Sequence, residues 1–220
     1  DPSREQSDRD ALVDRLFAPV VSAVSIQCLH DLVAGHWSRP RDIVHAVEET
    51  GCDAVLLSAQ FDGVLEETEA QLVAVSVFLQ SHRDLRNELS DLSALSPKAR
   101  ADLAQTVFQS VLGQPSLRLL RRCVGRTSHG HLLGKLRELA VRAANLSGRR
   151  FVFVESAHEL SDDQKMRLEK ILETKLASPV SATYTLRPEL LGGLVIRMGT
   201  ERVDASLATR VGALKRTIVG

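Results

Sequence analysis

The spacing of the apolar residues changes once along the chain, near Gly148. Before that point apolar residues recur every three to four positions, which is the spacing of amphipathic helices. After it, residues 151–154 form a continuous apolar run and residues 180–187 alternate between apolar and polar side chains, as strands do. The two periods predict an α+β fold, with an N-terminal helical bundle followed by a small C-terminal α/β domain that has a mixed sheet.

These patterns divide the chain into three parts. Residues 1–38 are expected to form additional N-terminal helices, residues 39–148 a six-helix bundle, and residues 149–220 the α/β domain. The predicted order in the last part is strand, helix, strand, strand, helix.

A weak repeat links the first part to the second. Seven residues between positions 9 and 33 recur without a gap at an offset of 91, and Arg9, Phe17 and Val33 are among them. Shared amphipathic spacing explains part of this match. If the repeat is genuine, residues 9–38 are the closing part of a second helical unit.

Several residues mark where helices begin. Pro40 suits an early helical position, Ser96 is the expected N-cap of the next helix with Pro97 first inside it, and Ser161 with Gln164 forms a capping box. Gly51 marks a kink or a break. The expected inward residues include Leu72, Val75 and Leu79, then Leu103, Val107, Val111 and Leu112, and finally Leu168, Ile171 and Leu172.

The charges balance overall but not locally. Lys and Arg total 28, as do Asp and Glu, and this zero net charge argues against a dedicated nucleic-acid-binding protein. Residues 42–69 include eight acids and no Lys or Arg, whereas residues 115–150 include nine basic residues and one acid, Glu138. The two segments either attract each other or form docking surfaces of opposite sign. A helical adaptor or nucleic-acid-binding protein using the basic face of residues 118–126 is the alternative function.

No pattern predicts catalysis, a cofactor or a metal site. Cys123, His129 and His131 lack a fourth ligand at a usual spacing. The glycines near Lys135 resemble a phosphate loop, but Gly130 is followed by His131 where that loop needs Lys. The three cysteines suggest no disulfide framework, which favours a reducing compartment. No apolar run is long enough to span a bilayer.

The C-terminal segment carries the most distinctive motif. Its residues are, in chain order, Pro188, Gly192, Gly193, Arg197, Gly199, Asp204 and Ser206. Two glycines before an apolar strand, then Arg-x-Gly, a turn and Asp-x-Ser resemble the delta subunit of rotary ATP synthase, called the oligomycin-sensitivity-conferring protein in mitochondria. The resemblance covers residues 40–219, with departures from the family pattern at Thr200-Glu201 and Ala205. The additional N-terminal helices resemble the longer delta subunits of actinobacteria.

This resemblance implies a non-catalytic stator subunit of the peripheral stalk. In the family, the bundle holds the N-terminal helix of an alpha subunit of the catalytic head, CF(1), and the C-terminal domain binds the end of the b subunit. The resemblance implies that the protein couples rotation and hydrogen ion transport to ATP synthesis. The expected location is the cytoplasmic face of the cell membrane, with membrane association only through the complex and no contact with nucleic acid.

The resemblance also suggests partner-binding residues. The family's groove lies between the first and fifth bundle helices, which correspond by position to residues 41–61 and 116–126. The candidates in these helices are Val44, Val47, Val55, Leu117 and Leu120, although some must serve the bundle's own core.

The motif residues themselves are expected to be structural. Gly192 and Gly193 suit close packing or a positive φ before the strand, and Ser206 after Asp204 suits a helix cap. Arg197 is expected to extend to solvent or to form an ion pair, with Asp204 across the hairpin as the candidate partner.

Overall fold

The computed structural model of the chain describes residues 5–91, 93, 95–126, 131–190, 193–198 and 201–204. Helices precede a small sheet in these residues, which confirms the α+β class. The chain divides into two compact units, residues 1–54 and residues 55–220. The three-part division predicted from the sequence remains a prediction.

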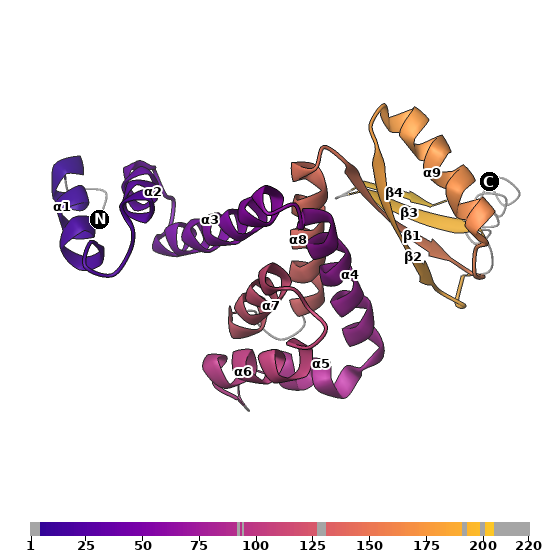
Figure 1. Cartoon of the computed structure of the whole chain (residues 1–220), viewed down its shortest axis with the longest axis horizontal. Helices are drawn as coiled ribbons and strands as arrows, with labels where there is room; N and C mark the ends of the chain where they lie inside the picture. The colour runs from indigo at the N-terminus through magenta and orange to yellow at the C-terminus, as the bar shows by residue number, and fades with distance from the viewer. Residues whose placement is uncertain are drawn as a thin grey trace, which may run out of the picture. The chain divides into compact units, whose positions relative to one another are not determined.

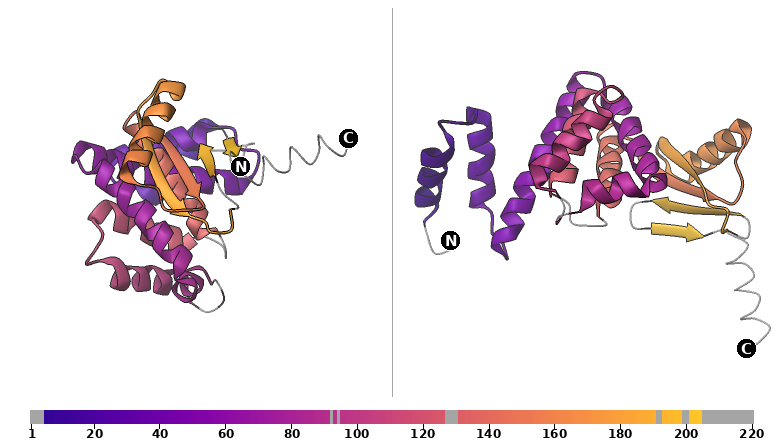
Figure 2. Two further views of the ribbon diagram at one scale, coloured as in Figure 1. Left: turned by 90° about the vertical axis from the view of Figure 1, so that its right-hand side faces the viewer. Right: turned by 90° about the horizontal axis from the view of Figure 1, so that it is seen from below.

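The first unit opens with two short helices that lie side by side, α1 (Gln6–Phe17) and α2 (Ala23–Ala34) (Figure 2). Pro19 lies in the turn between them, where it interrupts the helical run. Nη1 of Arg9 on α1 donates to the carbonyl oxygen of Val33 at the end of α2, at 2.8 Å. Because the last carbonyls of a helix have no partner within it, this arginine completes the end of α2.

The long helix α3 (Pro40–Phe61) begins at Pro40, as predicted. It is continuous through Gly51, so the helix has no break there, and Oγ1 of Thr50 donates to the carbonyl oxygen of Ala46 at 2.8 Å. The boundary between the two units falls within this helix.

The helix boundaries agree with the sequence repeat. Helix α6 (Pro97–Phe108) has 12 residues, as α1 has, and begins 97 − 6 = 91 positions after it. Helix α7 (Gln114–Arg126) begins 114 − 23 = 91 positions after α2. Coinciding helix starts at the offset of the sequence match favour a genuine repeat over shared spacing alone. The packing differs, because Phe17 is 40% exposed whereas its counterpart Phe108 is 5% exposed.

In the second unit the end of α3 is followed by helices that pack on one another: α4 (Leu65–Ser81), α5 (Arg83–Ser90), α6, α7 and α8 (Leu132–Leu146). The predicted stripe of Leu72, Val75 and Leu79 on α4 is buried. Nε2 of Gln60, at the end of α3, donates to the carbonyl oxygen of Leu146 at 3.1 Å. This bond ties the end of α3 to the end of α8.

The start of α6 was predicted correctly, but its inward face was not. Ser96 accepts from the backbone N–H of Ala99, with Pro97 as the first helical residue. Val107 and Val111 are exposed, so the prediction that they face inward is wrong. The buried residues of this helix are instead Arg100, Ala104 and Phe108, which lie four residues apart on a neighbouring stripe of the helix surface.

The sheet has four strands in the order β2-β1-β3-β4: β1 (Arg150–Ser156), β2 (Val180–Leu186), β3 (Leu194–Met198) and β4 (Glu201–Asp204). Strand β1 pairs in parallel with β2 and antiparallel with β3, so the sheet is mixed, as predicted. A parallel pair needs a crossover connection, and α9 (Asp162–Leu176) supplies it on one face of the sheet (Figure 1). The predicted closing helix lies outside the described residues.

The α/β part has its own small core under α9. Val152 and Val154 of β1 and Leu172 of α9 are its buried residues, and Leu168 packs against them. The capping box at Ser161 and Gln164 is present, as predicted. Ile171 is exposed, so its predicted inward position is wrong; the sheet meets the neighbouring stripe of Leu168 and Leu172.

Candidate interaction surfaces and the helix–sheet junction

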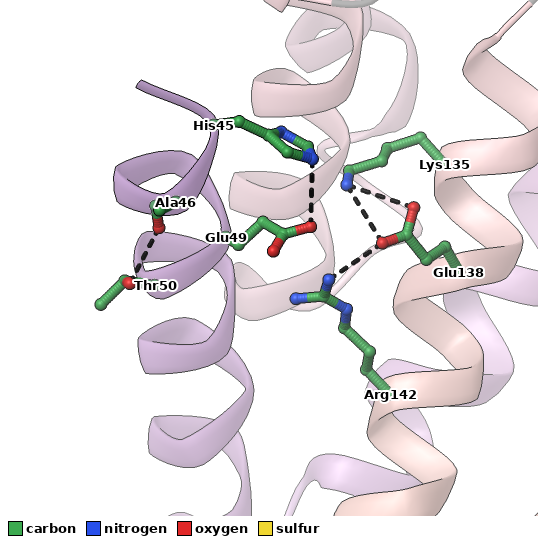
Figure 3. A network of polar contacts seen from close by, with 7 residues as sticks. All are labelled: His45, Ala46, Glu49, Thr50, Lys135, Glu138 and Arg142. Carbon is green, nitrogen blue, oxygen red and sulfur yellow. Dashed lines mark hydrogen bonds and ion pairs between the residues drawn. The ribbon is translucent and has the colours of Figure 1, made fainter. Parts of the chain in front are cut away.

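The first half of α3 presents an apolar face to solvent. Val44 and Val47 lie one helical turn apart and are both exposed, as a partner-binding face requires. Beside them, Nε2 of His45 pairs with a carboxylate oxygen of Glu49 at 3.3 Å (Figure 3). Val55, in the second unit, is half-buried. The partner-binding role predicted for these valines remains a prediction.

Helix α7 presents charge rather than apolar surface. Leu117 and Leu120 are buried in the second unit, so they serve its core. Arg118 and Arg122 are exposed, and Nη2 of Arg121 pairs with Asp102 on α6 at 3.4 Å. The basic face predicted for residues 118–126 is therefore real at these positions, although the side chain of residue 126 lies outside the described ones.

Helix α8 carries charges arranged around one acid. Oε1 of Glu138 accepts from Arg142 at 3.0 Å, and Lys135 lies 3.2 Å from Oε2 of the same carboxylate (Figure 3). Pairs at this spacing along an exposed helix contribute only tenths of a kcal/mol each, about 0.3–0.5. This cluster supports the helix and leaves α8 with a net positive surface.

The junction between the helices and the sheet contains a buried carboxylate. Glu69 on α4 is 3% exposed, although it belongs to the acidic segment 42–69. Its Oε2 accepts from Nη2 of Arg149 at 2.8 Å, and its Oε1 accepts from the hydroxyl of Ser181 on β2. Burial raises the pKa of Glu69, while Ser181 and Arg149 act in the opposite direction. One side chain thus joins α4, the residue before β1, and β2.

The end of α8 places Arg149 for this contact. Gly148 has φ +70°, the left-handed conformation that ends helices, and the backbone N–H of Arg149 donates back to Ala144 at 2.9 Å. The next residue, Arg150, already donates to the carbonyl oxygen of Pro179 at 2.8 Å, at the start of the β1–β2 pair. The reversal at Gly148 therefore turns the chain directly from helix into sheet.

A second contact joins the same two layers. Nη2 of Arg137 on α8 donates to Oε1 of Gln80 on α4 at 3.2 Å, and its guanidinium lies 5.7 Å from the ring centroid of Phe153 on β1. Burial, with the nearby charge of Arg197, lowers the pKa of Arg137. The sheet face opposite α9 is thus in contact with the helices at two places.

On the sheet face opposite α9, one carboxylate pairs with two arginines. Oε2 of Glu155 on β1 accepts from Nη1 of Arg187 at 3.1 Å and from Nη2 of Arg197 at 3.2 Å. The hydrogen bond to Glu155 raises the pKa of Arg187. Arg197 is therefore ion-paired, as expected, and its partner among the described side chains is Glu155. The side chain of Asp204 lies outside the described ones, so the predicted contact with Asp204 remains a prediction. The strand register permits the pair with Glu155, because Glu155 lies opposite Val195, two residues before Arg197 on the same face of the sheet.

The remaining motif residues are described only in part. Gly193 has φ +81°, the conformation expected before the strand. Asp204 ends β4. Gly192, Gly199 and Ser206 lie outside the described residues.

Neither a metal site nor a membrane-spanning helix is found where the structure describes the chain. No three His, Cys, Asp or Glu side chains gather there as a metal site would need. Of the candidate ligands, Cys123 is buried and His129 is not described. The described helices include none that is long and apolar enough to cross a bilayer.

Comparison with known proteins identifies the family. The family model described as ATP synthase delta (OSCP) subunit matches residues 49–218. The chain belongs to the ATP synthase delta (OSCP) subunit family. The ATP synthase subunit delta of Corynebacterium aurimucosum is 33% identical over 215 residues, which are 98% of this chain and 79% of that relative. That of Frankia casuarinae is 31% identical over 220 residues, which are 100% of this chain and 79% of that relative.

Membership of this family makes the chain a non-catalytic subunit of ATP synthase, as predicted. Both relatives come from actinobacteria, in agreement with the resemblance of the additional N-terminal helices. A chain of the Toxoplasma gondii mitochondrial ATP synthase hexamer aligns with a TM-score of 0.48 and 20% identity, over 79% of this chain and 98% of that chain. This structural likeness is too weak to support an argument.

The sequence pattern missed the residues of the junction. Glu69 does carry a signal, since it lies four residues after Leu65 and three before Leu72, both of which are buried on α4. An acid within an apolar stripe points to a buried partner. Arg149 and Ser181 carry no such signal, because only the fold brings them near α4.

Proposed function

We propose that this delta-family chain is the peripheral-stalk stator subunit that links the catalytic head of the rotary proton-translocating ATP synthase to the b stalk. Such a link must hold the head still while the central shaft turns, so that rotation is coupled to ATP synthesis. The observation that carries the proposal is the family match across residues 49–218, which spans both the helices and the sheet. The buried junction at Glu69 fits this role, because a link under torque needs a firm connection between its two ends.

The proposed partner of the helical part is the N-terminal helix of an alpha subunit in the head. An amphipathic helix docks through apolar anchors one turn apart, and Val44 and Val47 offer such a pair. Val55 lies further along the same helix, α3, and is a third candidate contact. Because Leu117 and Leu120 are buried, we expect them to pack α7 against the core of the second unit rather than to contact the partner.

The proposed partner of the α/β part is the end of the b subunit. In this arrangement the protein lies at the cytoplasmic face of the cell membrane and is held there by the complex. We expect no nucleic acid among its partners, since the exposed Arg118 and Arg122 belong to a chain of zero net charge.

A binding assay with the alpha-subunit N-terminal peptide tests the proposal. We expect the whole chain to bind the peptide, and the double variant Val44→Asp, Val47→Asp to bind at least about tenfold more weakly, because two carboxylates would enter an apolar contact. The matched control is Val24→Asp, at an exposed valine on α2, which should bind as the wild type does.

Two outcomes contradict the proposal. One is a wild-type chain that does not bind the peptide, with circular dichroism showing that it is folded. The other is tight binding to duplex DNA with a steep salt dependence, which would favour the basic face of residues 118–126 as the functional surface.

A further inference from the structure

The sheet face opposite α9 carries a group of arginines near the end of β1. Successive residues of a strand point to opposite faces, and Val154 packs under α9, so Glu155 lies on the other face. There Glu155 accepts from Arg187, which follows β2, and from Arg197 on β3. Three segments of the chain therefore bring their charges together on one face of the sheet.

A third arginine reaches the same face from α8. The guanidinium of Arg137 lies 5.7 Å from the ring centroid of Phe153, which shares its face of β1 with Glu155. Burial, and after it the charge of Arg197, lowers the pKa of Arg137, while Glu155 acts in the opposite direction. Two like charges thus act on each other here. Arg137, Arg187 and Arg197 form the arginine cluster.

The arginine cluster has more positive charge than the acids beside it neutralise. Its guanidinium groups share the carboxylate of Glu155, whose side chain is only 15% exposed. Glu189 lies 3.7 Å from Arg187, but its side chain is 76% exposed, so water and salt screen most of its effect. A surplus of positive charge remains even when both acids are counted.

The arginines also have hydrogen-bond donors to spare. Among the described residues Arg197 is bonded through Nη2 alone, and its Nε is buried without a partner. The side chains of Arg187 and Arg197 are 40% and 37% exposed, so an incoming group can reach them. Because a guanidinium group binds a carboxylate through two parallel N–H donors, an acidic group fits this surface.

The exposure of the arginine cluster favours an acid that a protein partner carries. An exposed ion pair is weakened by water and salt, so it holds a free anion such as inorganic phosphate poorly. A carboxylate on a docked chain is different, because the rest of the interface keeps it close to the guanidinium groups. Opposite charges across such an interface also select the right partner.

We propose that the arginine cluster is the docking site for a carboxylate carried by the end of the b subunit. This inference rests on the stator function proposed above, which gives the α/β part that partner. It adds the face of the sheet that makes the contact and the chemistry of the contact. In the free chain Glu155 occupies the same guanidinium groups, so it competes with the incoming carboxylate.

A binding assay with the whole chain tests this inference. A fluorescent peptide that carries the end of the b subunit is titrated at low salt with the wild type and with the double variant Arg187→Gln, Arg197→Gln. We expect the double variant to bind about tenfold more weakly, because two charge-assisted contacts are lost. The matched control is Arg167→Gln, at an exposed arginine on α9, which should bind as the wild type does.

Two further arms test the chemistry. A peptide in which Asn and Gln replace every Asp and Glu should bind the wild type about as weakly as the acidic peptide binds the double variant. Glu155→Gln removes the competing carboxylate, so we expect it to bind the acidic peptide about threefold more tightly. A purely structural role of the arginine cluster would weaken binding in this variant instead.

The proposal is overturned if the double variant, folded by circular dichroism, binds the acidic peptide as the wild type does. It is also overturned if the acid-free peptide binds equally well, or if Glu155→Gln weakens binding. These three results leave the b subunit as the partner and reject only its docking site. A folded wild type that does not bind the peptide rejects the partner, and the docking site with it.

Discussion

Arg197 on β3 and Glu155 on β1 form an ion pair across the antiparallel strand pair, with Nη2 and Oε2 3.2 Å apart. Arg187 donates to the same oxygen, and the Glu155 side chain is only 15% exposed. One largely buried carboxylate therefore holds two guanidinium groups that would otherwise repel each other.

Replacing Glu155 by Gln should destabilise the second unit. Hydrogen bonds to charged groups contribute about 1.5–3 kcal/mol when one partner is shielded from water, so we expect a loss of about 1–3 kcal/mol in the free energy of unfolding. Urea denaturation followed by circular dichroism measures it. Glu189→Gln is the control, because Glu189 is mostly exposed and lies 3.7 Å from Arg187, and its effect should stay below about 0.5 kcal/mol. Equal effects of the two variants would show that Glu155 has no special role.

The repeat supplies a matched pair of aromatic residues. Phe108 is buried and meets the ring of Phe78 edge-on at 5.9 Å, whereas its counterpart Phe17 is 40% exposed. We expect Phe108→Ala to cost about 3–5 kcal/mol, as core phenylalanines do, and Phe17→Ala to cost roughly 1 kcal/mol or less. Thermal unfolding of both variants compares them. A Phe17→Ala variant as unstable as Phe108→Ala would mean that a partner or another segment already covers α1.

The capping box of α9 should matter for local stability. Ser161→Ala removes the acceptor for the backbone N–H of Gln164 and is expected to cost about 1 kcal/mol. Ser161→Asp keeps an acceptor oxygen and should unfold close to the wild type. Chemical denaturation checks both, and an Ala variant as stable as the Asp variant would show that the box is dispensable.

Glu69 should give the protein a characteristic pH dependence. Since burial raises its pKa in the folded state, the folded protein binds this proton more tightly than the unfolded chain does. Its contribution to stability is therefore present below the unfolded pKa and is lost as pH rises through the folded pKa. Wild type should gain stability relative to Glu69→Gln when pH is lowered from neutral through the ordinary glutamate pKa of 4.5. Melting temperatures of the two proteins at each pH test this, and a relative loss by the wild type on acidification contradicts it.

Local chemistry decided which features were predictable from the sequence. The caps at Ser96 and Ser161 depend on residues three positions apart, and the first two strands follow from a continuous apolar run and from alternation, so both kinds of feature were found. The prediction that Val107, Val111 and Ile171 face inward was wrong. Apolar spacing is compatible with two neighbouring stripes on a helix, and only the packing of the fold selects one of them.

The candidate sites depended more on the fold. Arg149 follows Glu69 by 80 residues and Ser181 follows it by 112 residues. No local sequence pattern can reveal contacts at such separations. The pairing of Arg197 with Glu155 was missed for a similar reason, because only the pairing of β1 with β3 brings these two residues together. The motif residues identified the family before the fold was known, since a family pattern needs only residue types and their order.

The stator role is tested most directly by ATP-driven proton pumping in inverted membrane vesicles from which the delta subunit has been removed. We expect the stripped vesicles to hydrolyse ATP without acidifying their interior. Adding the purified chain should restore acidification, and adding the Val44→Asp, Val47→Asp variant should not. Full acidification without the chain would rule out the stator role, and equal restoration by the wild type and the double variant would rule out Val44 and Val47 as the contact with the head.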